Sequence, residues 1–290
     1  MTWKKILEYL AYGFVSLFVV LMVVSVLKRG VYARDIGLNL LVVGNDSLSL
    51  ALIRPNEEHI TWIKLPSFMQ IKIDGSEAMY PVYSLWKFAT SERRPFEVVL
   101  KSVSNTLGVV LTSVVVVDGG SSPENLLAAM NRVSLKSNLS FRDRLALRQD
   151  LANLISYRKV LEVEVPKTAL TKKVDPDGFE VFDVNQIINL WTKNRFVFET
   201  LLGESVEVSV YNLSGVSGAG LLLSRKLEAS GLRVGEVVSK YENPPGGKGC
   251  VFATSEKNKK TIYFLERFLD CEKLKVKNLE ADERVKVWLI

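Results

Sequence analysis

The stretch Leu38-Asn-Leu-Leu-Val-Val-Gly-Asn-Asp-Ser-Leu-Ser-Leu-Ala-Leu-Ile-Arg54 decides the fold of the larger part of this chain. Residues 38–43 are almost all apolar, which predicts a buried strand, and the turn residues Gly44-Asn-Asp46 close it. Leucine alternates with small residues over 48–52, the pattern of a second strand. A third strand is predicted over 60–65, where Pro66 stops it. Strands this close together must pair as hairpins.

Downstream, predicted helices and strands alternate. Pro95 opens a helix that Gly108 closes, and the β-branched run 113–117 predicts a central strand buried on both faces. Before a boundary near Gly203-Glu204 we also expect a short helix from Pro123, a helix capped by Ser140 and Asp143, a strand over 160–165 and a helix over 188–202. The fold class is therefore α/β (α+β), with a mixed-sheet domain over residues 36–203.

The pattern restarts after the boundary. Helices are predicted over 219–227 and 261–268, with Gly231 just beyond the first. The strands predicted around them cover 206–211, 233–238, 250–254, 274–279 and 285–289. Residues 204–290 thus read as a small β-α-β-β-α-β domain of ordinary size.

Before the first domain, residues 9–27 form an uncharged apolar run of 19 residues. At about 1.5 Å per residue a helix of this length crosses the roughly 30 Å apolar core of a bilayer. A buried core helix would show a polar face, and a cleaved signal peptide would show a shorter apolar region and a small-x-small site. We expect a single-pass anchor in the cytoplasmic membrane. Positive charge flanks both ends, but the short tail 1–8 favours a cytoplasmic N-terminus with residues 30–290 extracytoplasmic.

The composition and net charge limit the classes of partner that the chain could bind. The formal net charge is +6, and once the charges flanking the apolar run are set aside 34 basic and 31 acidic residues remain, a net +3. No basic block with interleaved aromatic residues occurs, so we expect no nucleic-acid partner.

Two cysteines and one histidine offer little site chemistry. Cys250 and Cys271 fit no zinc pattern, and in an oxidising compartment they either form a disulfide or stay as two buried thiols. His59 lies between two predicted strands, as a turn residue or, alternatively, a catalytic base. We expect no metal site.

The first domain resembles the LytR-CpsA-Psr family of bacterial cell-envelope proteins. The resemblance rests on the stretch 38–55, the strand Ile60-Thr-Trp-Ile-Lys-Leu-Pro66, the helix end Thr106-Leu-Gly108 and the strand Val114-Val-Val-Val-Asp118. The expected anchor directly before these segments also fits the family. The resemblance implies transfer of undecaprenyl-phosphate-linked glycopolymers to peptidoglycan. It also implies a site of carboxylates, arginines and a divalent cation around the lipid pyrophosphate.

The chain departs from the family where that chemistry resides. The family has Pro-Arg-Asp after its third strand, whereas this chain has Pro66-Ser-Phe68. Serine cannot replace the bidentate pairing of arginine with phosphate. Asp46 is the one carboxylate that carries over, and it is also a natural turn-forming residue. Arg142, Arg144 and Arg148 are similar to the family's arginine-rich helix, or they form a solvated face.

Residues 205–290 resemble the LytR C-terminal domain through Val206-Glu-Val-Ser-Val-Tyr-Asn-Leu-Ser-Gly-Val-Ser-Gly-Ala-Gly220. This matches the opening strand, the Asn-x-Ser/Thr-Gly loop and the start of a helix. Asn212, Ser214, Gly215 and Gly218 are the candidate ligand-binding residues, since helix amides can meet an anion there. No catalytic residue carries over from that domain.

Together these features predict a membrane-anchored, non-catalytic envelope protein that binds or scaffolds peptidoglycan or a lipid-linked glycopolymer, with no cofactor. The alternative is an active glycopolymer–peptidoglycan phosphotransferase that uses Mg²⁺. A transcriptional attenuator, which the family's older name suggests, would need a DNA-reading motif that this sequence lacks.

Overall fold

The computed structural model describes residues 3, 12–17, 20, 30–175, 178–239, 246, 248–274 and 284–290. Of the predicted anchor, only residues 12–17 and Val20 are described, and they are helical; the rest of it lies outside the described residues. Among the described residues, no helix combines the length and the apolar character needed to cross a membrane.

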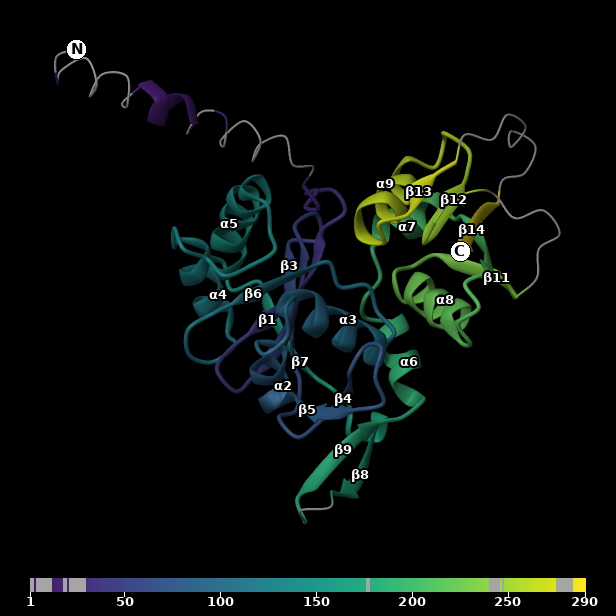
Figure 1. Cartoon of the computed structure of the whole chain (residues 1–290), viewed down its shortest axis with the longest axis horizontal. Coiled ribbons are helices and arrows are strands. Elements are labelled where there is room, and N and C mark those ends of the chain that lie inside the picture. The colour runs from purple at the N-terminus through teal and green to yellow at the C-terminus, as the bar shows by residue number, and fades with distance from the viewer. Residues whose placement is uncertain are drawn as a thin grey trace.

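The predicted hairpins form the middle of a five-stranded mixed sheet (Figure 1). β1 (Leu38–Val43), β2 (Leu48–Arg54) and β3 (His59–Lys64) run antiparallel to their neighbours. β6 (Ser113–Val116) adds to β1 and β7 (Val160–Glu164) adds to β3, both in parallel, giving the order β6-β1-β2-β3-β7.

Helices cover both faces of this sheet, which explains why β1 and β2 are buried throughout. Odd-numbered Leu41 and Val43 pack under α2 (Val82–Ala89) and α3 (Pro95–Leu107). Their even-numbered neighbours pack on the other face, against α4 (Pro123–Met130) and α5 (Phe141–Ser156). As predicted, Pro95 begins α3, and Gly108 ends it with a left-handed φ of 65°.

β6 is an edge strand, so the prediction of a central strand is wrong. It is nevertheless buried because residues 136–138 cover its outer edge. Val116 N–H donates to the Lys136 carbonyl at 3.0 Å, and Val114 N–H donates to the Asn138 side chain at 2.7 Å. An edge strand that is covered by another segment is as apolar as a central strand, so the sequence could not distinguish the two positions in the sheet.

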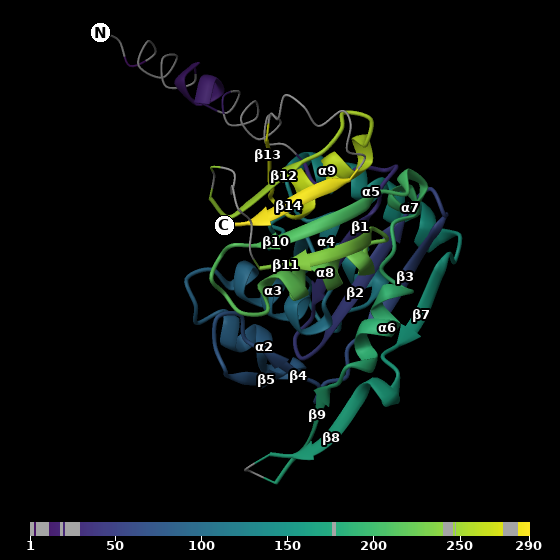
Figure 2. The same cartoon turned by 90° about the vertical axis from the view of Figure 1, so that its right-hand side faces the viewer.

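Two small hairpins extend the first unit. β4 (Gln70–Lys72) pairs with β5 (Met79–Pro81) beneath α3. A short 3-10 helix, Lys167–Ala169, leads into β8 (Leu170–Val174), which pairs with β9 (Glu180–Val184) to form an arm that projects from the molecule (Figure 2).

The single helix predicted over 188–202 is two helices, α6 (Ile187–Lys193) and α7 (Glu199–Glu204). Phe196 and Phe198 between them are both fully buried, but in the cores of different units. Phe198 is accordingly extended, at φ −102° and ψ 110°. The spacing of the apolar residues over 188–202 is that of a helix. Because Phe196 and Phe198 are buried in cores on opposite sides of the chain, the backbone between α6 and α7 must be extended.

The second unit is another five-stranded mixed sheet, of order β11-β10-β14-β12-β13. Its strands are β10 (Glu207–Asn212), β11 (Arg233–Val238), β12 (Cys250–Ala253), β13 (Glu272–Lys273) and β14 (Val285–Leu289). α8 (Ala219–Ala229) and α9 (Lys259–Phe268) pack on one face. The predicted strand over 274–279 falls outside the described residues except for Leu274, which follows β13.

Two residues of the first unit belong to the core of the second. Ile36 and Val110 of the first unit pack with Phe198, α8 and α9 of the second. Val31 contacts this core and also the α4–α5 side of the first sheet. The short segment 30–36 therefore lies at the seam between the units.

Candidate functional site

Asp46 lies exposed in the β1–β2 turn. The chain around it is closed by backbone bonds: Gly44 N–H donates to the Ser47 carbonyl and Asn45 N–H to the Gly119 carbonyl, both at 2.8 Å. The structure places Asp118, which directly precedes Gly119, and its ion-pair partner Arg132 beyond the neighbouring end of β6, and the adjoining strand ends also carry serines.

Those serines form a compact network at the strand ends. The Ser49 and Ser121 hydroxyl oxygens are 2.8 Å apart, and Ser121 N–H donates to the Ser47 hydroxyl at 2.9 Å. A Cβ atom at Gly44 would come within 2.6 Å of both the Ser121 nitrogen and the Ser47 hydroxyl oxygen. This tight packing holds the end of β1 directly against the β6–α4 loop at Gly44.

The apolar layer between the first sheet and α2–α3 is filled. Side chains from both sides of the layer have no accessible surface at all: Leu41, Leu50, Ile63, Leu85, Val99 and Val103. A void wide enough for one water molecule would give its lining residues some accessible surface. A surface groove of about 670 Å³ does follow Pro66; Leu65 and Val165, at the edge of this core, line it together with Lys64, Glu164 and the β8–β9 arm.

The three arginines of α5 have different roles. Arg144 donates to the Met130 carbonyl at 3.0 Å and the Val133 carbonyl at 3.3 Å, so it fastens the end of α4 to α5. Arg142 and Arg148 are exposed. Among the described residues, no hydrogen bond or ion pair joins any of the three to the serine network, although Ser49 points to the same face of the sheet that α4 and α5 cover.

The polar side chains of the predicted C-terminal ligand loop bond to the loop itself. Asn212 donates to the Val216 carbonyl at 2.9 Å, and its side-chain oxygen accepts from the Ser214 hydroxyl at 2.7 Å. Gly215 and Gly218 have left-handed φ values of 73° and 79°. These four residues build the turn into α8, a structural role that accounts for each of them.

Cys250 and Cys271 are joined in the structure by a disulfide, with their Cα atoms 4.5 Å apart. The bridge links the start of β12 to the residue that precedes β13. The open choice between a bridge and two thiols is resolved by the return of the chain through α9, which brings both residues to one end of the sheet.

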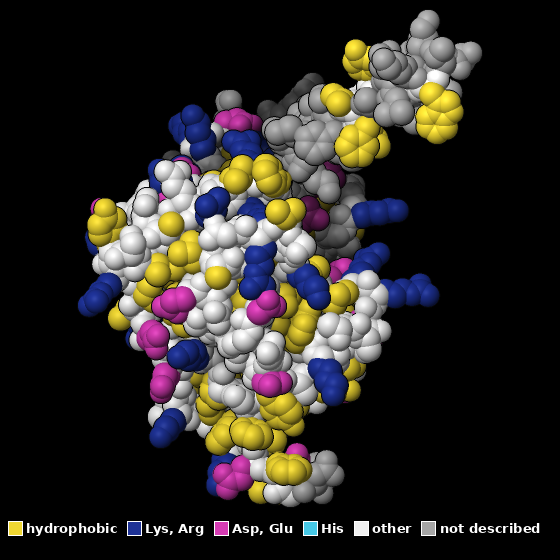
Figure 3. Space-filling model, turned by 90° about the vertical axis from the view of Figure 1, so that its left-hand side faces the viewer, with side chains coloured by type: hydrophobic (Ala, Val, Ile, Leu, Met, Phe, Trp, Pro, Cys, Tyr) yellow, Lys and Arg dark blue, Asp and Glu magenta, His cyan; other side chains and the backbone are white. Residues whose placement is uncertain are grey.

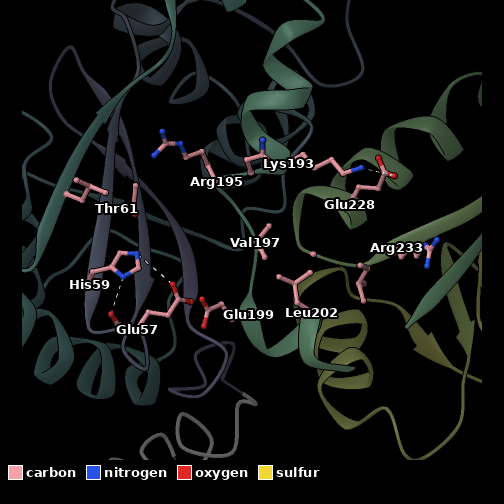
Figure 4. Close-up of a pocket in the computed structure, with 14 residues that line it drawn as sticks. Glu57, His59, Thr61, Lys193, Arg195, Val197, Glu199, Leu202, Glu228 and Arg233 are labelled. Carbon is pink, nitrogen blue, oxygen red and sulfur yellow. Dashed lines mark hydrogen bonds and ion pairs between the residues drawn. The ribbon is translucent and has the colours of Figure 1, made fainter. Parts of the chain in front are cut away.

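A groove of about 680 Å³ between the two units is lined by charged side chains that the sequence analysis had not placed together in a site (Figure 4). Glu57 lies in the β2–β3 turn, and His59 is the first residue of β3. Arg195 lies in the linker between α6 and α7, Glu199 begins α7, and Glu228 belongs to α8. Figure 4 shows the Glu57 and Glu199 carboxylates turned toward each other beside the His59 ring. The groove therefore offers both acidic and basic groups to one ligand.

The electrostatics of this groove centre on Glu57. Burial raises the pKa of Glu57, the nearby Arg54 charge opposes that rise, and the Glu199 carboxylate adds to it. His59 Nδ1 lies 3.2 Å from the Glu57 carbonyl oxygen. Within the described ranges no three His, Cys, Asp or Glu side chains are placed to hold a metal ion. The groove is suited to hydrogen bonding and charge pairing with a polar ligand.

Arg54, at the end of β2, supports the back of the groove. It is 4% exposed and donates to the Asn39 side chain at 2.7 Å and to the Val197 carbonyl at 3.3 Å. Burial lowers its pKa to about 10, and Glu57 opposes that change. Among the described residues no carboxylate pairs with it directly, so its charge is held by carbonyl and amide oxygens.

A second cation, the half-buried Lys226 of α8, faces the first unit on the other side of the seam. Its ammonium donates to the Asn105 side chain at 2.6 Å, and Asn105 in turn donates to Asp74 at 2.7 Å. Burial lowers the pKa of Lys226 to about 8, which the Asp74 charge opposes. This chain of polar groups crosses the interface between the units.

A third cluster of polar side chains joins α5 to segment 30–34, and the sequence contained a signal for it. Asp143 and Asp150 lie on the same helical face as Leu147 and Leu151, where a carboxylate requires a partner. In the structure they bind segment 30–34: Asp143 accepts N–H bonds from Val31 and Tyr32, both at 3.0 Å, and Asp150 accepts from the Tyr32 hydroxyl at 2.6 Å. Ser140 caps α5 as predicted: its hydroxyl accepts the Asp143 N–H at 3.1 Å and donates to the Asp143 carboxylate at 2.8 Å, and the same carboxylate also holds this segment.

No protein-family model matches the chain, and no curated protein matches it. Among solved structures, Bacillus subtilis TagT aligns with a TM-score of 0.41 at 13% identity, covering 58% of this chain and 92% of that chain. The LytR-CPS2A-psr family protein YwtF (TagT), with bound octaprenyl pyrophosphate lipid, gives 0.38 at 14% identity, covering 56% and 89%. An Enterococcus faecalis protein described as a transcriptional regulator gives 0.41 at 10% identity, covering 82% and 98%. These are distant structural similarities, and no activity passes from those proteins to this chain through them.

Proposed function

We propose that this chain is a membrane-anchored, extracytoplasmic envelope protein that binds a cell-wall component without catalysis. The observation that carries the proposal is the filled layer beneath α2 and α3, together with the serine network that closes the strand ends. A polyprenyl pyrophosphate needs an apolar channel and cationic or metal partners for its phosphates. Leu41, Leu50 and Val103 have no accessible surface, which supports the proposal that no such channel opens between this sheet and α2–α3.

The groove between the units is the binding site in this proposal. Its paired carboxylates and its lysine and arginine side chains complement a ligand that bears both amino and carboxylate groups, as the peptide stems of peptidoglycan do. The alternative, a phosphotransferase, would bind the lipid-linked substrate in the first unit.

One titration experiment separates the two functions. Full-length protein in detergent is titrated with a soluble peptidoglycan stem peptide and, separately, with octaprenyl pyrophosphate plus Mg²⁺. We expect saturable binding of the peptide and none of the lipid. Glu57→Gln with Glu199→Gln should weaken peptide binding, whereas Glu92→Gln, on an exposed loop of the first unit, should not. Saturable lipid binding with metal-dependent turnover of a lipid-linked polymer would overturn the proposal.

A further inference from the structure

The segment that follows the predicted anchor is fastened to α5 along two helical turns. Asp143 accepts the N–H groups of Val31 and Tyr32, and Asp150 accepts from Tyr32 and from Arg34 Nε at 2.9 Å. Gly30 lies so close that a Cβ atom there would come within 2.3 Å of an Asp143 oxygen. The start of the folded part is therefore fixed at the first turns of α5.

Chain length then limits the distance between α5 and the membrane. The apolar run ends at Leu27, and Val31 is already bound to Asp143. Four residues span at most about 14 Å even when fully extended. Because the headgroup layer on each side of a bilayer is roughly 5–8 Å thick, the N-terminal turns of α5 must lie at or near the headgroups.

The outward face of α5 has the composition of a membrane-contacting surface. Phe141 and Leu145 are 47% and 50% exposed and point away from the Leu147–Leu151 face that packs on the sheet. Arg142 and Arg148 flank them and are exposed. In Figure 3, which faces the α4–α5 side, hydrophobic and basic side chains lie together on the upper part of the surface. Aromatic and apolar groups with arginines beside them match the interface of an anionic bilayer.

We propose that the Phe141–Leu145 face of α5, with Arg142 and Arg148, docks on the anionic lipid surface of the membrane that holds the anchor. This inference rests on the proposed membrane anchoring. Docking would fix the orientation of both units, because segment 30–34 and α5 form one hydrogen-bonded body.

Photo-cross-linking of the full chain in nanodiscs tests this face. The cross-linker p-benzoylphenylalanine replaces Phe141, Leu145 or, as a matched control, Phe179, which is 62% exposed near the tip of the β8–β9 arm. Phosphatidylglycerol-containing and purely phosphatidylcholine discs are compared, and co-migration with the disc reports insertion. We expect lipid adducts at 141 and 145, several-fold fewer at 179, and a higher yield in phosphatidylglycerol discs that Arg142→Gln with Arg148→Gln removes.

The outcomes are distinguishable. A chain that inserts but gives no more adduct at 141 and 145 than at 179 overturns the docking face alone. Equal yields in the two kinds of disc overturn the anionic-lipid assignment. A chain that does not insert overturns the anchored function and this face together. Because all three positions are exposed, substitution there leaves the cores intact, and circular dichroism checks the fold.

Discussion

The guanidinium carbon of Arg54 lies 4.2 Å from the centre of the Phe198 ring. Arg54 belongs to the first sheet, and Phe198 is fully buried in the core of the second unit. One cation therefore joins the two units by stacking and by hydrogen bonds to the linker carbonyls. A planar, delocalised cation is suited to this position because it stacks and donates in several directions at once.

Replacing Arg54 with lysine should destabilise the chain. Lysine keeps the charge but loses the planar stack and most of the donors, so we expect the free energy of unfolding to fall by about 2–4 kcal/mol. Arg233→Lys, at an exposed position, should change it by no more than about 0.5 kcal/mol. Urea denaturation measures both. Equal effects of the two variants would show that the Arg54–Phe198 contact does not join the units.

Lys226 predicts a pH dependence of stability. Its pKa is lowered to about 8 in the folded chain, so between pH 8 and about 10.5 the unfolded state binds more protons and stability rises with pH. Lys226→Met removes the buried charge, and it should be more stable than the wild type at pH 7 and show a smaller rise up to pH 9.5. Lys87→Met, at an exposed position of α2, controls for the loss of one charge. Parallel pH–stability curves for Lys226→Met and the wild type would contradict this role.

The disulfide should contribute measurably to stability. A bridge between positions 21 residues apart stabilises by roughly 3 kcal/mol in the chain-entropy model. Mass spectrometry of the unreduced, exported protein should find Cys250 and Cys271 joined, and Cys250→Ala with Cys271→Ala should lower the denaturation midpoint. Two free thiols in the exported protein would remove this prediction.

A fragment of the second unit should need residues from before its predicted boundary. Phe198 and Leu201 are fully buried in its core, and the Glu204 carboxylate accepts the Lys260 and Thr261 N–H groups at the start of α9, both at 2.8 Å. We expect fragment 197–290 to unfold cooperatively and at higher denaturant than fragment 204–290, which lacks Phe198. Equal midpoints would place the boundary at residue 204.

Membrane topology is tested by fusing alkaline phosphatase after Ile290. The proposed function requires an extracytoplasmic C-terminus, where the phosphatase folds and is active. A fusion that is expressed and inserted but inactive would reverse the orientation.

The sequence pattern predicted those strands and helices whose signals lie within a few neighbouring residues. The run 38–43, the alternation over 48–52, Pro95 and Gly108 each encode their structure within a few residues, and β1, β2 and α3 follow them. The interface could not be predicted, because its partners are far apart in the chain. Arg54 and Phe198 are 144 positions apart and Tyr32 and Asp150 118, and neither pair has a spacing that marks it. The candidate groove was missed for the same reason: its walls come from separate units.

Val31 packs against both cores, and it lies four residues after the end of the proposed anchor. Tension between membrane and wall would therefore enter the protein at the seam between its units. The N–H bonds to Asp143 and the Tyr32–Asp150 bond would carry that load first, before either sheet. Since Val31 contacts both cores, such a pull would be shared between two bodies rather than peeling one strand from an edge, and in the proposed function the protein would act as a coupling that bears force.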